Sequence, residues 1–325
     1  MTKIVIDTLG ADDGFTPIVN GVACALAEGL DFFPVLIGPG KELQQILDQQ
    51  NIASSRYELV DACEFVRNED APTCVFGGAE NTTMVKAYNY LKTDVECSAM
   101  LSAGNTGALL VGAICRLGLL PGLKFPALLS ALPCNGDNLL CLVDCGANIE
   151  CTADDLVRFA KMGHAFAKCY CGLDSPRVGL MSVGRERQKG TALIQQAYER
   201  ISQQELNFVG NVEGSDLVSD YVDVIVTDGF SGNLLLKCAE SVGKAAAMIV
   251  EKYGAGIPEM EKCRQILLET FDFNSRGAAT FLGPKKTVVK MHGKANADTV
   301  VASIKQTLRL EKAGFTQAVA AELSK

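Results

Sequence analysis

Glycines, amide side chains and single carboxylates follow five short apolar segments of this chain. A parallel strand has this pattern where its carboxyl end opens into a ligand-binding crevice. Glycine lets backbone N–H groups approach an anion closely, and the helix that follows such a strand adds the positive end of its dipole. The five segments therefore predict one crevice that is lined by backbone amides and suited to phosphate; they are 101–107, 142–148, 180–190, 207–214 and 224–233.

Lys189 and Asp228 are the residues of these segments whose charges could support a reaction of phosphate. Phosphate is largely ionised at neutral pH, so as a nucleophile it needs positioning and charge compensation more than a strong base. Lys189 lies near Arg185 and Arg187 and could neutralise the phosphate or a developing oxyanion. The alternatives are a solvated basic turn for Lys189 and a helix N-cap for Asp228, and an N-cap would still lie at the crevice.

Motifs for several other chemistries are absent from the sequence. No GxGxxG follows the first predicted strand, and neither a Walker GxxxxGK[ST] nor a GxSxG motif occurs. With only two histidines, the chain disfavours a Ser-His-Asp or Cys-His catalytic set. His164 lies on an apolar helical stripe and is expected in the core, whereas His292 ends a strand and is a candidate site residue. We expect no metal and no organic cofactor.

Charge and cysteine usage indicate the class of protein. The net charge of −8 argues against nucleic acid as a partner. The thirteen cysteines form no Cys-x-x-Cys pair and follow no secretion signal, which favours reduced thiols that serve as small core residues. The longest apolar run, 107–115, is shorter than the roughly 20 residues that a membrane span needs. We therefore expect a soluble cytoplasmic protein.

Strand-like and helix-like segments alternate along the chain, which predicts a mostly parallel sheet with helices on both faces. At 325 residues, the chain is expected to form one large α/β domain or two closely joined lobes. A capping box from Thr152 to Asp155 begins one helix. Other predicted helices span 16–28, 41–50, 82–92, 106–117, 234–252 and 258–271. Predicted strands span 4–7, 34–37, 57–60, 99–101, 127–132, 139–143, 178–183, 208–212, 222–226 and 287–291.

Five motifs resemble those of the phosphate acyltransferases of bacterial phospholipid synthesis. They are GNTG at 104–107, DCGAN at 144–148, GxExxKG at 184–190, NFVGNVEG at 207–214 and TDGFSGN at 227–233. The resemblance implies a three-layer αβα fold, related to isocitrate dehydrogenase and phosphotransacetylase, in a homodimer. It also implies acyl transfer from acyl-[acyl-carrier-protein] to inorganic phosphate. The family's proposed catalytic pair matches Lys189 and Asp228.

Three segments depart from the pattern of that family. The opening loop reads DTLGADDG at 7–14, where the family usually has DAMGGD. FGGAE at 76–80 replaces a basic run, and RGAAT at 276–280 replaces a Gly-Gly-Ala-Pro element. Arg185 and Arg187 do not belong to the usual pattern, and we expect them to compensate for the missing cations.

We therefore expect an enzyme that makes acyl phosphate from long-chain acyl-[acyl-carrier-protein] and inorganic phosphate. Lys189 would stabilise negative charge, and Asp228 would orient the phosphate or move a proton. The phosphate would lie against the amides near 104–107 and 210–214. The expected substrate-binding residues are Asp7, Gly10, Ser102, Gly104, Asn105, Thr106, Gly107, Asp144, Asn148, Glu186, Asn211, Glu213, Gly214, Gly229, Asn233 and His292.

Two classes of alternative stay open at this point. One is a short-chain phosphotransacetylase or a nicotinamide-dependent oxidoreductase on the same fold, because a fold does not determine its chemistry. The other is a non-catalytic relative that binds the carrier protein or acyl chains.

The resemblance also implies a projecting helix pair near 234–271. Tyr253 and Ile257 at its turn favour a weak, reversible contact with a membrane surface. Glu251, Glu259 and Glu261 oppose that contact, because anionic lipid surfaces repel carboxylates. The alternative is a helix pair whose apolar side packs at the dimer interface.

Overall fold

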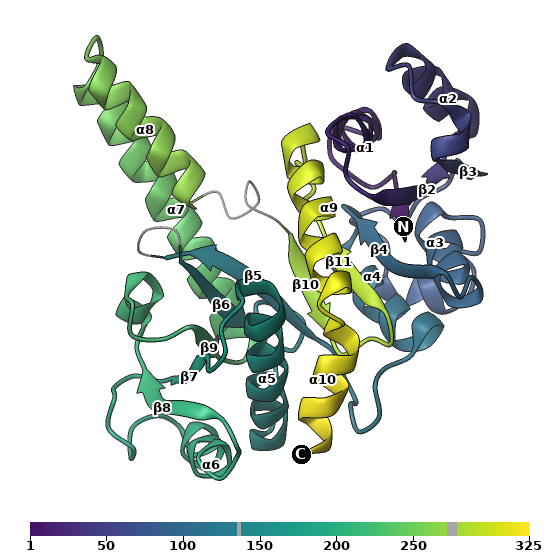
Figure 1. The fold of residues 1–325 in the computed structure, drawn as a ribbon. Coiled ribbons are helices and arrows are strands. Elements are labelled where there is room, and N and C mark those ends of the chain that lie inside the picture. The colour runs from purple at the N-terminus through teal and green to yellow at the C-terminus, as the bar shows by residue number, and fades with distance from the viewer. Residues whose placement is uncertain (135–137, 272–277) are drawn as a thin grey trace. The chain divides into compact units, whose positions relative to one another are not determined.

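The computed structural model describes residues 1–134, 138–271 and 278–325 (Figure 1). The chain divides into two compact units, each with a sheet and helices of its own. Unit 1 comprises Met1–Pro126 and Gly277–Ser324, and unit 2 comprises Ala127–Arg276 together with Lys325. The RGAAT segment begins outside the described residues, which resume at Ala278.

The sheet of unit 1 has the strand order β3-β2-β1-β4-β11-β10. β1 pairs in parallel with β2 and β4, β2 with β3, and β4 with β11. β10 is antiparallel to β11. The strands are β1 Thr2–Asp7, β2 Phe32–Gly38, β3 Glu58–Asp61, β4 Cys97–Ser102, β10 Ala279–Leu282 and β11 Thr287–Lys290.

Helices cover both faces of this sheet. Ile4 and Ile6 of β1 share a buried cluster with Ile18 of α1 and Ile304 of α9. Successive strand residues point to opposite faces, so buried Val5 points away from that cluster. The buried residues of α3 lie outside the cluster, and this helix packs against β1, β2 and β4. The helices are α1 Thr16–Ala27, α2 Gly40–Gln49, α3 Thr83–Thr93, α4 Thr106–Gly112, α9 Ala297–Lys312 and α10 Phe315–Ser324.

The sheet of unit 2 has the strand order β5-β6-β9-β7-β8. β6, β9, β7 and β8 run parallel, and β5 is antiparallel to β6. α5 packs against β6, β7 and β9, and α6 packs against β7 and β8. The strands are β5 Ala127–Pro133, β6 Leu139–Val143, β7 Arg177–Met181, β8 Asn207–Val212 and β9 Val224–Val226. The helices are α5 Ala153–Phe166, α6 Ala192–Ile201, α7 Gly229–Tyr253 and α8 Pro258–Phe271.

α7 and α8 pack side by side as a long pair that extends from the unit 2 sheet (Figure 1). Their close approach requires a small residue, because a Cβ atom on Gly243 would lie 2.1 Å from Cβ of Phe271. Gly256, with φ of +84°, makes the turn between the helices, and Pro258 begins α8.

The predicted alternation of strands and helices is confirmed, and two elements, 139–143 and 258–271, have their predicted bounds. The capping box is also present: Thr152 Oγ1 accepts the Asp155 N–H at 3.3 Å, and Asp155 Oδ2 accepts the Thr152 N–H at 2.9 Å. β10 and the antiparallel directions of β10 and β5 were not predicted from the sequence. π-helical turns at 113–117 and 167–171 follow α4 and α5.

The thirteen cysteines are free of disulfides, but their interpretation as core residues is only partly right. Cys97, Cys141 and Cys145 are buried, whereas the exposed ones are Cys24, Cys63, Cys238 and Cys263. His164 is buried, as expected. None of the described helices combines the length and the apolar character that crossing a membrane requires.

Candidate active site

Four of the five predicted strand ends lie along one edge of the unit 2 sheet. β6, β9, β7 and β8 are parallel neighbours, so their carboxyl ends meet at the same edge. The segments that leave these strands carry Asp144, Asp228, Lys189 and Glu213. The fifth segment, 101–107, belongs to unit 1, and a single crevice that includes it stays a prediction.

Asp144 organises the loop that leaves β6. Its Oδ1 accepts hydrogen bonds from the backbone N–H groups of Leu128, Gly146 and Ala147 at 3.0–3.1 Å. Its Oδ2 accepts two more from Asn148, from the backbone N–H at 2.7 Å and from Nδ2 at 2.6 Å. Burial raises the pKa of Asp144, and these donors oppose the rise. The amides of 146–148 thus donate to this carboxylate and are not available to phosphate. This differs from the expectation that all five segments line the crevice with backbone amides.

Asp228 caps the N-terminus of α7. Its Oδ1 accepts the backbone N–H of Ser231 at 2.8 Å, and its Oδ2 accepts the Ser231 hydroxyl at 2.8 Å. The N-cap alternative is therefore confirmed. The N–H of Gly229 donates to the Asn148 carbonyl at 2.7 Å, and a Cβ on Gly229 would lie 2.6 Å from that oxygen. Glycine at this position thus allows the Asp228 and Asn148 loops to meet at the start of α7.

Lys189 lies on the loop between β7 and α6. Its backbone N–H donates to the Glu186 carbonyl at 2.9 Å. Its aliphatic chain lies against Gly184, where an added Cβ would be 3.1 Å from Lys189 Cγ. Among the residues that the structure describes, none forms an ion pair or a hydrogen bond with its ammonium group. Lys189 therefore offers an exposed, unpaired positive charge at the edge where the strands end.

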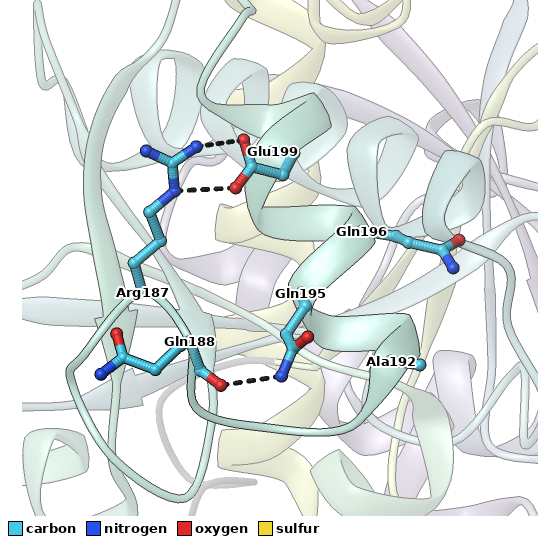
Figure 2. Close-up of a pocket in the computed structure, with 6 residues that line it drawn as sticks. All are labelled: Arg187, Gln188, Ala192, Gln195, Gln196 and Glu199. Atoms are coloured by element: carbon cyan, nitrogen blue, oxygen red, sulfur yellow. Dashed lines mark hydrogen bonds and ion pairs between the residues drawn. The ribbon is translucent and has the colours of Figure 1, made fainter.

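Arg185 and Arg187, by contrast, are paired with carboxylates. Arg185 Nη2 lies 2.6 Å from Asp216 Oδ1, and its guanidinium lies 4.6 Å from the ring centre of Tyr221. Arg187 forms a two-pronged ion pair with Glu199 of α6 (Figure 2). Compensation for the basic run missing at 76–80 would require unpaired cations, so this geometry does not support that expectation.

Two buried oxygens beside the Lys189 loop lack a hydrogen-bond partner among the described residues: Asn211 Oδ1 and Ser182 Oγ. Asn211 lies opposite Leu180 across the β7–β8 pair, and Ser182 is two residues further on, so both side chains point to the same face. Buried polar atoms are nearly always hydrogen-bonded, and these two oxygens therefore favour a position for a polar ligand group. Ser182 was missed as a site residue, although it lies within the strand end 180–190.

Glu213 and Asn233, two further predicted residues of unit 2, also lie near the edge where these strands end. Glu213 precedes a 3₁₀ turn at Gly214–Val218, and its backbone N–H donates to Asp216 Oδ2 at 2.9 Å. Asn233 is exposed on α7 and lies beside Gly146. Their contact with substrate stays a prediction.

In unit 1, hydrogen bonds join Asp7 to the start of the 104–107 segment. Ser102 Oγ donates to Asp7 Oδ2 at 2.7 Å and accepts the N–H of Gly104 at 3.0 Å. Gly10, with φ of +88°, packs so closely that a Cβ would lie 2.9 Å from Gly104 Cα. The structure therefore brings Asp7, Gly10, Ser102 and Gly104 together.

The remaining predicted residues of unit 1 follow strand ends. Asn105 is the N-cap of α4, and its Oδ1 accepts a backbone N–H of the first turn at 2.9 Å. Thr106 and Gly107 form the beginning of that turn. His292 follows β11, and its Nδ1 accepts the backbone N–H of Lys294 at 3.1 Å. A substrate-binding role for these residues stays a prediction.

Asp7 makes the stability of unit 1 depend on pH. Burial raises its pKa from 3.8 to about 6, and the hydrogen bond from Ser102 opposes the rise. A raised pKa in the folded state means that protonation favours folding, so the contribution is complete below pH 4 and is lost as pH rises through about 6.

We expect Asp7→Asn to remove this dependence, because asparagine keeps an acceptor for Ser102 and does not titrate. The unfolding free energy of the wild type minus that of the variant should fall by about 2–3 kcal/mol between pH 4 and pH 7. Urea unfolding of both proteins at several pH values measures this difference. A difference that does not vary with pH would mean that Asp7 titrates normally in the folded protein.

A cavity of about 440 Å³ lies between the Lys189 loop and α6 (Figure 2). Ala192 is the one apolar side chain among its lining residues, so the cavity does not suit an acyl chain. Within residues 1–134, 138–271 and 278–325, no group of three or more His, Cys, Asp or Glu side chains could hold a metal ion.

Comparison with known proteins identifies the family. A family model described as fatty acid synthesis protein matches residues 2–318. A phosphate acyltransferase from Clostridioides difficile is 32% identical over 99% of this chain and 96% of its own length. A phosphate acyltransferase from Caldanaerobacter subterraneus subsp. tengcongensis is 36% identical over 95% of this chain and 93% of its own. This chain belongs to the phosphate acyltransferase family.

The solved structures show the fold of this phosphate acyltransferase family member. A phosphotransacetylase from Streptococcus pyogenes superposes with a TM-score of 0.64, covering 100% of this chain and 94% of its own. Its sequence identity of 16% is too low to indicate function. The expected α/β fold with a mostly parallel sheet, similar to phosphotransacetylase, is confirmed.

Proposed function

We propose that this chain transfers the acyl group of a long-chain acyl-[acyl-carrier-protein] to inorganic phosphate. A phosphate oxygen attacks the thioester carbonyl carbon, and the carbon–sulfur bond breaks as the carbon–oxygen bond forms. The products are acyl phosphate and the carrier-protein thiolate, which takes up a proton. Family membership supports the reaction class, since the relatives named above are phosphate acyltransferases.

The observation that carries the proposal is the unpaired ammonium group of Lys189 at an edge where four neighbouring strands end. Phosphate is anionic, and the oxygen of the neutral thioester gains negative charge in the transition state. A fixed cation stabilises that developing charge more than it stabilises the neutral thioester. Lys189 is suited to this role, whereas the nearby arginines are already neutralised by carboxylates.

Asp228 is proposed to act beside Lys189 from the adjacent strand. β9 and β7 are neighbours, so the segment that begins with Asp228 and the Lys189 loop leave the sheet side by side. The hydrogen bonds with Ser231 hold the Asp228 carboxylate in one orientation. Each carboxylate oxygen keeps a further lone pair that could accept a proton from phosphate or orient it.

The test is direct detection of acyl phosphate. The protein is mixed with palmitoyl-[acyl-carrier-protein] and phosphate, and the product is trapped with hydroxylamine as the hydroxamate. We expect hydroxamate that depends on phosphate and on enzyme, together with stoichiometric free thiol. Activity with acetyl-coenzyme A in its place would favour a short-chain phosphotransacetylase. Carrier-protein binding without hydroxamate would favour the non-catalytic alternative.

We also propose that the α7–α8 pair contributes to a homodimer. α7 exposes Val242, Met248 and Ile249, which are 58%, 67% and 60% accessible in the single chain. Apolar side chains clustered on one helix usually mark an interaction surface. Sedimentation velocity of the purified protein tests this proposal, with a monomer at micromolar concentration as the contrary result.

The turn of the same pair is proposed to contact membranes weakly. Tyr253 is 75% accessible and Ile257 48%, but the flanking Glu251 and Glu259 are exposed carboxylates that an anionic surface repels. We expect Tyr253→Ser/Ile257→Asp to reduce a weak flotation with liposomes and to leave acyl phosphate formation in solution unchanged. Equal flotation of both proteins would leave the dimer contact as the role of this surface.

A further inference from the structure

One glutamine of α6 contacts the backbone on both sides of Lys189. Gln195 Nε2 donates to the carbonyl of Gln188 at 2.7 Å and to that of Gly190 at 3.3 Å. Figure 2 shows this side chain pointing from α6 to the loop, while Gln196 points away from it. A primary amide carries two N–H donors on one nitrogen, so a single Gln can hold two carbonyls.

An ion pair holds the same loop to the same helix. Arg187, two residues before Lys189, reaches Glu199, which lies four residues after Gln195 and so on the same face of α6 (Figure 2). Exposed ion pairs add little to stability because solvent screens them. A two-pronged pair nevertheless restricts the direction of the loop.

Strand β8 also contacts the loop that carries Lys189. Asn211 Nδ2 donates to the carbonyl of Glu186 at 2.9 Å, and that carbonyl also accepts the Lys189 N–H. Gly190 adopts φ of +94°, and a Cβ there would lie 2.7 Å from the side chain of Ile194. Backbone or side-chain contacts thus hold the loop on both sides of Lys189, whose own ammonium group stays unpaired among the described residues.

We propose that Gln195 is a positioning residue for Lys189, assisted by the Arg187–Glu199 ion pair. This inference rests on the proposed function. A lysine has a long flexible stem, and its charge lowers a barrier only when it is held where charge develops. Gln195 restricts the peptide groups on either side of Lys189, and so restricts the volume that its ammonium group can sample. Because the tether is exposed, its loss should change turnover more than stability.

Gln195→Met tests the proposal, because methionine has a similar length and no N–H donor. Gln196→Met is the matched control on the same helix. We expect Gln195→Met to lower kcat by about tenfold with little change in the KM for phosphate, and Gln196→Met to have no effect. The thermal midpoint should stay the same in both variants.

Two further measurements separate positioning from a general structural effect. In a Lys189→Met background, Gln195→Met should cause no further loss of kcat, since the group that it positions is gone. Hydrogen exchange of the 186–190 amides should be faster in Gln195→Met and unchanged in Gln196→Met. If hydrogen exchange is unchanged in Gln195→Met, Gln195 does not hold the loop. If exchange is faster but kcat equals that of the wild type, Gln195 holds the loop without positioning Lys189 for the reaction.

The exchange measurement does not depend on the proposed function. If the wild-type protein forms no acyl phosphate, the proposed function fails, and exchange alone then decides whether Gln195 holds the Lys189 loop.

Discussion

Lys189→Met is expected to lower the turnover of phosphate-dependent acyl transfer by on the order of 10²–10³-fold, the loss typical of one electrostatic donor in an active site. Methionine keeps the aliphatic stem that lies against Gly184 and removes the charge. Since the ammonium group has no ion pair among the described residues, its removal leaves no buried carboxylate unpaired, and the fold should be unaffected. Hydroxamate assays at saturating phosphate measure the effect.

Lys189→Arg provides the control for charge alone. Arginine is also cationic, but its planar guanidinium is larger and would not occupy the position of a compact ammonium group. We expect intermediate turnover. A folded Lys189→Met variant with near-normal turnover would show that Lys189 is the solvated basic turn of the alternative interpretation.

Asp228→Asn is expected to lower turnover by on the order of 10²–10⁴-fold, the range for a lost acid–base group. Asparagine is as good an N-cap as aspartate, so its carbonyl can still accept the Ser231 N–H at the start of α7. The substitution therefore removes the charge without removing the cap. Turnover and the thermal midpoint, measured on the same preparation, separate the two roles.

Asp228→Ala supplies the comparison, because it removes both the charge and the cap. It should lose about 1 kcal/mol of stability in addition to the turnover. Should Asp228→Asn retain wild-type turnover while Asp228→Ala is merely less stable, Asp228 serves only as a helix cap.

The alternation of strands and helices and the positions of the strand ends were predictable from sequence, because both depend on local residue patterns. Runs such as 139–143 are apolar throughout, as strands covered on both faces require, and glycine-rich exits mark where they stop. β10, with the sequence ATFL, was missed because it lacks the adjacent valines that mark the equally short β11, TVVK. β5 and β6 pair in antiparallel because the chain reverses its direction between them, and the composition of the two strands does not show this.

The start of α7 shows how local and tertiary information differ. Asp228 was recognised as a possible cap, yet the helix was predicted to begin at residue 234, because Gly229, Gly232 and Asn233 are poor helix formers. The structure begins α7 at Gly229, where the close approach to Asn148 excludes a side chain. At the start of α7, packing against the neighbouring loop therefore overrides the low helix propensity of these residues.

The sequence by itself determined the chemical class of the site: which residues leave the strands, and that these include Lys189 and Asp228. Only the tertiary structure decided which charges and amides at these strand ends are already paired with other groups of the protein. The amides of 146–148 donate to Asp144, and Arg185 and Arg187 pair with Asp216 and Glu199. The Asp144 carboxylate lies in the same loop as these amides, and the local backbone conformation directs them to it. Asp216 and Glu199 lie on a 3₁₀ turn and on α6, so only folding brings them within reach of the arginines. Lys189 is left unpaired among the described residues by the same arrangement.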